Sequence, residues 1–155
     1  PPPPVFKSSA DHRYKHSFPP RRSSDLDELV EVMYHALENG YTVCWDGDTS
    51  EKTFSHDNGK ADLPRKLKGK VDQALRQETF YNRSTTDDHL MHVVGISTDG
   101  KGEKLFYIKN SWGANSNDYG GYLHMTEDYV RLKTLAVLVN KESLPDHIMK
   151  KLNLK

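Results

Sequence analysis

The sequence predicts an α+β fold in which an antiparallel β-sheet is flanked by helices. One observation is an apolar stripe with steps of three and four residues, which runs from Leu26 to Leu37 and marks an amphipathic helix. Another is a set of later runs rich in β-branched and aromatic residues and bounded by glycine-containing loops, as expected for strands. Their short connections are typical of an antiparallel meander.

Length and composition set the outer limits of the prediction. The chain has 155 residues, the length of one domain of ordinary size. Hydrophobic residues make up 35% and the mean hydropathy is -0.81, which indicates that part of the chain does not pack. The 22 basic and 22 acidic residues balance, so neither nucleic acid nor an anionic membrane is favoured as a partner. No apolar run approaches the roughly 18 residues of a membrane span.

Residues 1–26 differ in character from the rest of the chain. Pro1–Pro4 favours polyproline II, and the basic residues that follow show no apolar period. The strings DHR, HSFP and RRSSDL resemble the translation of a common sequencing adapter. We therefore expect 1–26 to be disordered or an adapter artefact, with a natural proline-rich linker as the alternative, and 27–155 to be the folded part.

The first predicted elements are a helix and a short strand. The helix over 26–37 carries acids in its first turn and ends at Asn39-Gly40. The strand over 41–45 is expected to stop at the polar turn 46–48. The segment 56–70 is polar and contains Gly, Pro and Lys, so we expect an excursion on the surface.

The second half continues with a helix over 71–81 and a long strand over 85–98. A glycine-rich turn at 99–102 closes a hairpin, with 105–109 as the returning strand. The remaining predicted elements are a strand at 122–125, a short turn or helix at 127–131, a strand at 134–140 and a helix at 144–152 with Pro145 in its first turn.

The hairpin suggests a candidate active site. His89 opens one strand and Asn110 ends the next, so an antiparallel pairing makes their side chains neighbours. A Cys/His/Asn peptidase needs an imidazole that takes the proton of a thiol and an amide oxygen that holds this imidazole in one tautomer. Trp112 lies two residues after Asn110, where its indole can cover their hydrogen bond from water. Each residue alone is more often structural, so the arrangement carries the prediction.

Three strings place this arrangement in a family context: HLMHVVG at 89–95, YIKNSWG at 107–113 and GGYLHM at 120–125. Together they resemble the C-terminal half of papain-like cysteine peptidases, in particular the bleomycin hydrolase and aminopeptidase C branch. The resemblance implies that 27–155 is the C-terminal part of a papain-like peptidase domain, with the antiparallel sheet carrying the site.

The resemblance also implies a role for each site residue. His89 corresponds to the general base, Asn110 to the amide that orients it and Trp112 to the shielding indole. The family histidine lies six residues before the glycine that is Gly95 here, which selects His89 over His92. His92 is expected to point to the opposite face of the strand, toward the core or a packed helix.

The nucleophile of such enzymes belongs to the N-terminal half. Papain-like spacing puts the histidine about 130–150 residues after the cysteine, further than His89 lies from Pro1. We therefore expect a C-terminal fragment of a cysteine aminopeptidase that hydrolyses peptide bonds with a Cys-His-Asn triad and is inactive alone. The alternative is a non-catalytic papain-like binding module.

The single cysteine, Cys44, is expected to be a buried, inert thiol, because it lies in a strand without a helix N-terminus to lower its pKa. A zinc site from Asp87-Asp88, His89 and His92 lacks a further Cys or His at ligand spacing, so no metal is expected. The resemblance implies no cofactor, a peptide substrate and a cytoplasmic location. It also implies a parent that assembles as a homo-oligomer, often a hexamer in the family.

Overall fold

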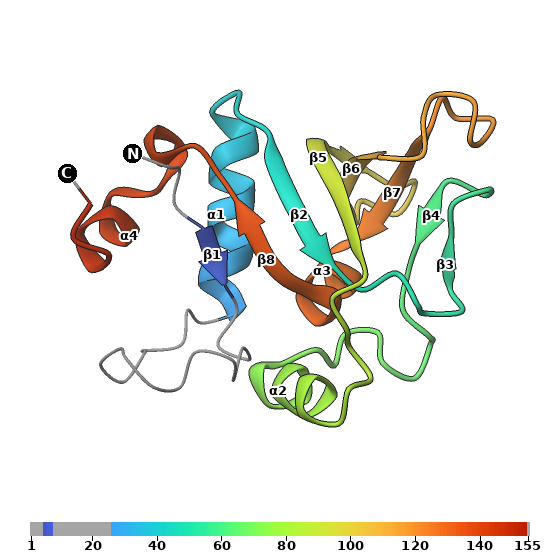
Figure 1. Cartoon of the computed structure of the whole chain (residues 1–155), viewed down its shortest axis with the longest axis horizontal. Helices are drawn as coiled ribbons and strands as arrows, with labels where there is room; N and C mark the ends of the chain where they lie inside the picture. Colours follow the sequence, from blue (N-terminus) through green and yellow to red (C-terminus); the bar gives the residue numbers. More distant parts are fainter. Residues whose placement is uncertain (1–4, 8–25, 155) are drawn as a thin grey trace.

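The computed structural model describes residues 5–7 and 26–154, which adopt the predicted α+β fold (Figure 1). The strands are β1 (Val5–Lys7), β2 (Val43–Gly47), β3 (Phe54–Ser55), β4 (Lys60–Ala61), β5 (His89–Thr98), β6 (Lys104–Asn110), β7 (Tyr122–Thr126) and β8 (Thr134–Leu138). The helices are α1 (Leu26–Glu38), α2 (Gln73–Tyr81), α3 (Glu127–Lys133) and α4 (Asp146–Lys151), with a 3-10 helix η2 at Lys141–Ser143.

Most of the segment 1–26 lies outside the described residues, and so does the expectation that it is disordered or adapter-derived. Two parts of it are described. Val5–Lys7 forms β1, which pairs antiparallel with β8, and Leu26 is the first residue of α1. The segment is therefore not unstructured throughout.

One sheet contains all the described strands, in the order β1-β8-β2-β5-β6-β7-β4-β3. The predicted meander is present as β5-β6-β7, where each strand pairs antiparallel with the next. The other strands depart from the meander, because β8 pairs with β2 and β4 pairs in parallel with β7. The site therefore sits near the middle of a broad sheet, at one end of the β5-β6 hairpin.

The inner face of the sheet packs on α1 and α3, and this face forms the core. The predicted amphipathic helix is present as α1, and its buried side chains are Leu26, Leu29, Val30, Val32, Met33 and Ala36. The helix is followed by Gly40, whose φ of +80° suits the left-handed turn that ends many helices. Tyr34 of α1 stacks on Phe106 of β6, with ring centroids 4.8 Å apart. Burial of these apolar groups is what fixes the helix on the sheet.

Strand β2 begins and ends two residues later than the predicted 41–45, so Asp46 and Gly47 of the expected stop at 46–48 still belong to the strand. Gly47 still pairs with both β5 and β8. A Cβ on Gly47 would lie 2.3 Å from the Lys133 carbonyl oxygen and 2.3 Å from the Trp45 ring. The glycine thus serves close packing inside the sheet and not a turn.

Gly47→Ala is expected to lower the free energy of unfolding by about 3 kcal/mol, at the upper end of overpacking costs, because one obstructing atom belongs to the backbone. Gly95→Ala is the matched control in β5, since the nearest atom to its added Cβ would be 4.0 Å away. We expect that control to stay within about 0.5 kcal/mol of the wild type. Urea unfolding followed by circular dichroism measures both, and equal effects would contradict the packing argument.

The sequence predicts a surface excursion for the segment 56–70, but part of this segment is buried. His56, Ala61 and Leu63 are buried, and β4 pairs with β7 in the register Ala61↔Met125. The two-residue strands β3 and β4 are too short to show a period of two in the sequence. The first half of the segment therefore belongs to the sheet edge and the core.

The other element boundaries move by a few residues. α2 begins at Gln73, because Asp72 caps it by accepting a hydrogen bond from the Leu75 amide at 2.8 Å. β5 begins at His89 and not at residue 85. α3 extends to Lys133, β8 ends at Leu138 and α4 covers Asp146–Lys151, with Pro145 as its N-cap.

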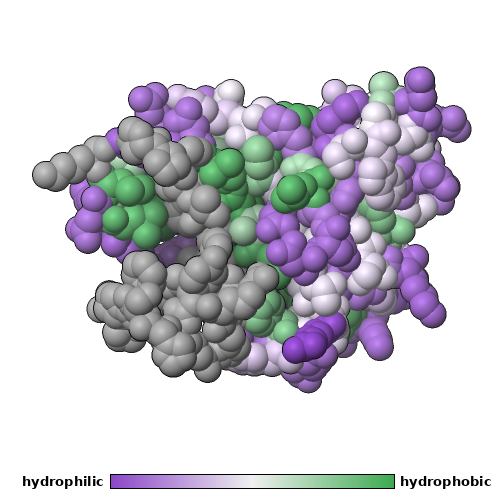
Figure 2. All heavy atoms as spheres, in the orientation of Figure 1, coloured by the Kyte–Doolittle hydropathy of each residue, from purple (hydrophilic) through white to green (hydrophobic). Residues whose placement is uncertain are grey.

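The outer face of β2 and β5 corrects two further predictions. Cys44 is exposed and not buried, because it points away from the face on which its neighbours Val43 and Trp45 are buried. His92 is also exposed, and its Nε2 lies 2.7 Å from Thr42 Oγ1 instead of facing the core or a helix. Leu90, on the same face, is 64% exposed. In the view of Figure 1 strand β8 crosses in front of α1, with β2 and then β5 beside it, and Figure 2 shows hydrophobic residues over the middle of this view.

Candidate active site

His89 and Asn110 meet at the end of the β5-β6 hairpin. His89 is the first residue of β5 and Asn110 is the last of β6, where it stands opposite Met91. Both side chains lie on the inner face, so they are diagonal neighbours across the ladder. His89 Nε2 is 2.8 Å from Asn110 Oδ1. The predicted contact is therefore present and it involves His89, while His92 lies on the opposite face.

A backbone donor fixes the direction of this hydrogen bond. The Ser111 amide N–H donates to Asn110 Oδ1 at 2.7 Å, which identifies that atom as the oxygen of the amide. Because the oxygen can only accept, His89 Nε2 carries the hydrogen and donates it to Asn110. This tautomer leaves Nδ1 of His89 as the ring nitrogen that can take a proton, as a general base requires.

Trp112 lies against the pair, as predicted. Its ring centroid is 5.0 Å from that of His89 and 4.8 Å from that of His56. Phe54 of β3 meets the indole edge-on at 6.4 Å. The indole is 54% exposed, so one side contacts the imidazoles and the other faces solvent. Its shielding role remains a prediction.

His56 is a site residue that the sequence did not indicate. It is only 6% exposed, and its Nδ1 lies 3.1 Å from the Asn110 side-chain nitrogen. Burial lowers the pKa of His56, and nearby His89 lowers it further, while Asp57 opposes the shift. No local pattern marks this residue, because the contact joins positions that are 54 residues apart.

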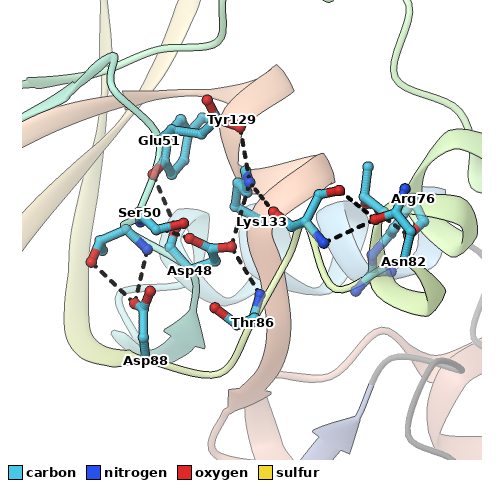
Figure 3. Close-up of polar contacts among 12 residues, drawn as sticks. Asp48, Ser50, Glu51, Arg76, Asn82, Thr86, Asp88, Tyr129 and Lys133 are labelled. Carbon is cyan, nitrogen blue, oxygen red and sulfur yellow. Dashed lines mark hydrogen bonds and ion pairs between the residues drawn. The ribbon is translucent and has the colours of Figure 1, made fainter.

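A carboxylate network holds the segment that leads into β5 (Figure 3). Asp48, directly after β2, accepts hydrogen bonds from the Thr86 amide at 2.8 Å and the Ser50 amide at 2.7 Å. Asp88 accepts from the Thr49 amide at 2.9 Å. The loop after β2 and the approach to β5 are thereby tied together, which explains why residues 85–88 are held outside the strand.

Lys133 closes this network from α3. Its ammonium lies 3.4 Å from Asp48 Oδ2 and 3.0 Å from Glu51 Oε1, and it donates to the Ser84 carbonyl at 2.9 Å. The side chains of Lys133 and Asp48 are 1% and 0% exposed. Tyr129 donates its hydroxyl to the Asp48 carbonyl at 2.9 Å. Figure 3 shows the lysine running from α3 to between these partners.

The electrostatics of Asp48 favour its charged form. Burial by itself would raise the pKa of the carboxyl, but the hydrogen bonds from Ser50 and Thr86 and the charge of Lys133 lower it below its ordinary value. The pair is thus a buried carboxylate and ammonium, and Asp48 directly follows Gly47, the residue that pairs with His89.

Cys44 stands apart from the imidazole. In the β2-β5 pairing Cys44 is opposite His92 on the outer face, whereas His89 is opposite Gly47. The only thiol of the chain therefore lies on the other side of the sheet from the candidate base. Among residues 5–7 and 26–154 no group of three or more His, Cys, Asp or Glu side chains is arranged to hold a metal ion.

A sheet with a paired His and Asn at a hairpin end, followed by a Trp, is the arrangement expected of a papain-like peptidase. The sequence model of the Peptidase C1-like family matches residues 22–155, and the chain belongs to that family. This confirms the resemblance inferred from the three sequence strings.

Two proteins are similar to this chain, one in sequence and one in fold. The chain is 26% identical over 131 residues to Aminopeptidase W of Lactobacillus delbrueckii subsp. lactis, an alignment that covers 80% of this chain and 29% of that protein. The crystal structure of PepW from Lactobacillus rhamnosis HN001 shares the fold, with a TM-score of 0.62 and 19% identity over 83% of this chain and 30% of that chain. The chain thus spans less than a third of either relative. Within the described part, no helix is long and apolar enough to cross a membrane.

Proposed function

We propose that this chain supplies the general base and the orienting amide of a cysteine-type aminopeptidase. The observation that carries the proposal is the hydrogen bond of 2.8 Å from His89 Nε2 to Asn110 Oδ1, which leaves Nδ1 able to accept a proton. Membership in the Peptidase C1-like family and the similarity to Aminopeptidase W support it. In this proposal the nucleophilic cysteine belongs to a part of the protein N-terminal to residue 27.

The proposed reaction uses the two residues in sequence. His89 Nδ1 takes the proton of the cysteine thiol, and the thiolate attacks the peptide carbonyl carbon to give a tetrahedral intermediate. The imidazolium returns the proton to the leaving amine as the C–N bond breaks, which leaves an acyl-enzyme. His89 then takes a proton from water, whose oxygen attacks the acyl carbon. The C–S bond breaks, the acid is released, and the imidazolium returns its proton to the cysteine sulfur. Asn110 Oδ1 holds the ring in one rotation throughout.

The test is an assay with aminoacyl fluorogenic substrates on three samples: this chain, its Cys44→Ala variant and this chain supplied with the upstream half of its gene product. We expect no hydrolysis by the first two, because a base without a nucleophile has nothing to activate. We expect activity in the third.

Activity that is lost in Cys44→Ala would overturn the proposal, since it would make the exposed thiol on the outer face the nucleophile. Inactivity of the third sample, with both parts folded, would favour a non-catalytic papain-like binding module instead.

A further inference from the structure

We infer that His56 is a positioning residue that fixes the side-chain amide of Asn110 and, through it, the ring of His89. Its importance for catalysis rests on the proposed function, but the positioning itself does not. His56 lies in the turn between β3 and β4, the two strands at one edge of the sheet. Its ring nevertheless reaches Asn110 at the end of the β5-β6 hairpin.

The contacts form a continuous chain of hydrogen bonds in which every donor is determined. Asn110 Oδ1 accepts from the Ser111 amide, so the other end of this side chain is the NH2 group. That group donates to His56 Nδ1 at 3.1 Å, and Nδ1 must therefore be unprotonated. His56 Nε2 then carries the hydrogen and donates to Ser116 Oγ at 2.7 Å. The Ser116 hydroxyl donates to the Gly113 carbonyl at 2.7 Å.

Both ends of this chain are backbone groups of the loop that follows β6. The Ser111 N–H can only donate and the Gly113 carbonyl can only accept, so the directions of the bonds between them cannot be reversed. The arrangement requires the neutral form of His56, and the burial that lowers its pKa favours that form.

The His56 backbone is itself anchored. Its carbonyl accepts from the Asn117 side chain at 2.8 Å and from the Gly59 amide at 2.9 Å. The same Asn117 nitrogen donates to the Tyr122 carbonyl at 2.9 Å, which ties the turn to β7. Trp112 meets the His56 ring edge-on at 4.8 Å. The imidazole is therefore held from several elements and is suited to positioning another group.

An amide that lacked this partner would be held at its oxygen only. A rotation of the Asn110 amide by half a turn would bring its NH2 group against the donors of Ser111 and His89. In the wild type the same rotation would also bring the oxygen against the lone pair of His56 Nδ1. His56 thus opposes the wrong orientation and satisfies an otherwise unpaired buried donor in the right one.

The test compares His56→Leu with His56→Asn, which have similar shapes. Only asparagine offers an oxygen near the position of Nδ1. Solvent exchange of the Asn110 side-chain NH2 is measured by NMR in the 155-residue chain, with the exposed Asn115 as reference. In the wild type and in His56→Asn we expect exchange at least about tenfold slower than at Asn115, and in His56→Leu within about threefold of it.

Fast exchange at Asn110 in the folded wild type would overturn the inference, even if His56→Leu did not fold. Slow exchange preserved in a folded His56→Leu would also overturn it. In the protein supplied with its upstream half, His56→Leu is expected to lower kcat by about 10- to 100-fold with KM within about twofold, and His56→Asn to restore most of kcat. An active wild type with unchanged kcat in His56→Leu would count against the inference. An inactive wild type with the expected exchange rates would count against the proposed function alone.

Discussion

His89→Ala is expected to lower kcat of the assembled peptidase by at least about 10⁴-fold, the scale seen when a member of a catalytic triad is removed. The structure gives the reason. His89 Nε2 is bound to Asn110 Oδ1, so Nδ1 is the nitrogen available for the thiol proton. Alanine removes the base for acylation and the acid for amine departure at once, so both half-reactions slow.

His92→Ala is the matched control for this variant. Both histidines belong to β5, but His92 is exposed on the outer face and contacts Thr42. We expect its kcat to stay within about twofold of the wild type, as is usual for surface substitutions away from a site. The assay uses aminoacyl substrates and this chain supplied with its upstream half. A large loss in His92→Ala with activity kept in His89→Ala would reverse the assignment of the base.

The part of the site that could be predicted from sequence depends on local pattern. A strand alternates its side chains, and a short glycine-rich turn fixes which strand returns, so the hairpin made a contact between His89 and Asn110 possible. The family resemblance then selected His89 over His92. Trp112 followed from its place two residues beyond Asn110. The α1 helix and its end at Gly40 were equally local, since stripe and glycine lie in adjacent sequence.

The part that could not be predicted depends on contacts between distant segments. His56 joins the site through a turn between two-residue strands, and such strands leave no periodic signal. Burial of Cys44 was wrongly expected because alternation tells which residues share a face, but not which face another element covers. Gly47 looked like a turn residue, yet its role comes from the approach of the Lys133 carbonyl, which is far along the chain.

Lys133→Met is expected to lower the free energy of unfolding by about 3–5 kcal/mol, the range for breaking a buried ion pair by removing one partner. Among the partners of Lys133, Glu51 is 24% exposed and can turn toward water. Asp48 cannot, since its side chain is fully buried. Its uncompensated charge therefore accounts for most of the expected loss.

Two further variants isolate this effect in urea unfolding. Lys60→Met removes a cation that is 57% exposed and lies 3.6 Å from Asp62, and we expect a change below about 1 kcal/mol. Asp48→Asn combined with Lys133→Met removes both charges, and we expect it to be more stable than Lys133→Met alone by about 1–3 kcal/mol. A loss in Lys133→Met no larger than in Lys60→Met would show that the buried pair contributes no more than a surface contact.

The pH dependence supplies an independent check on the same pair. In the wild type the pKa of Asp48 is lowered in the folded state, so its contribution to stability is complete above the ordinary aspartate pKa of about 3.9 and is lost as the pH falls through the lower folded value. Without Lys133 the folded pKa of Asp48 rises, because burial then acts against one fewer compensating charge. As the pH falls, Asp48 is therefore protonated at a higher pH in Lys133→Met than in the wild type, and this removes the unpaired buried charge of the variant. The difference in unfolding free energy between the wild type and Lys133→Met should be largest near neutral pH and shrink below about pH 4. A difference that stayed constant with pH would point to lost packing of the lysine stem and not to charge.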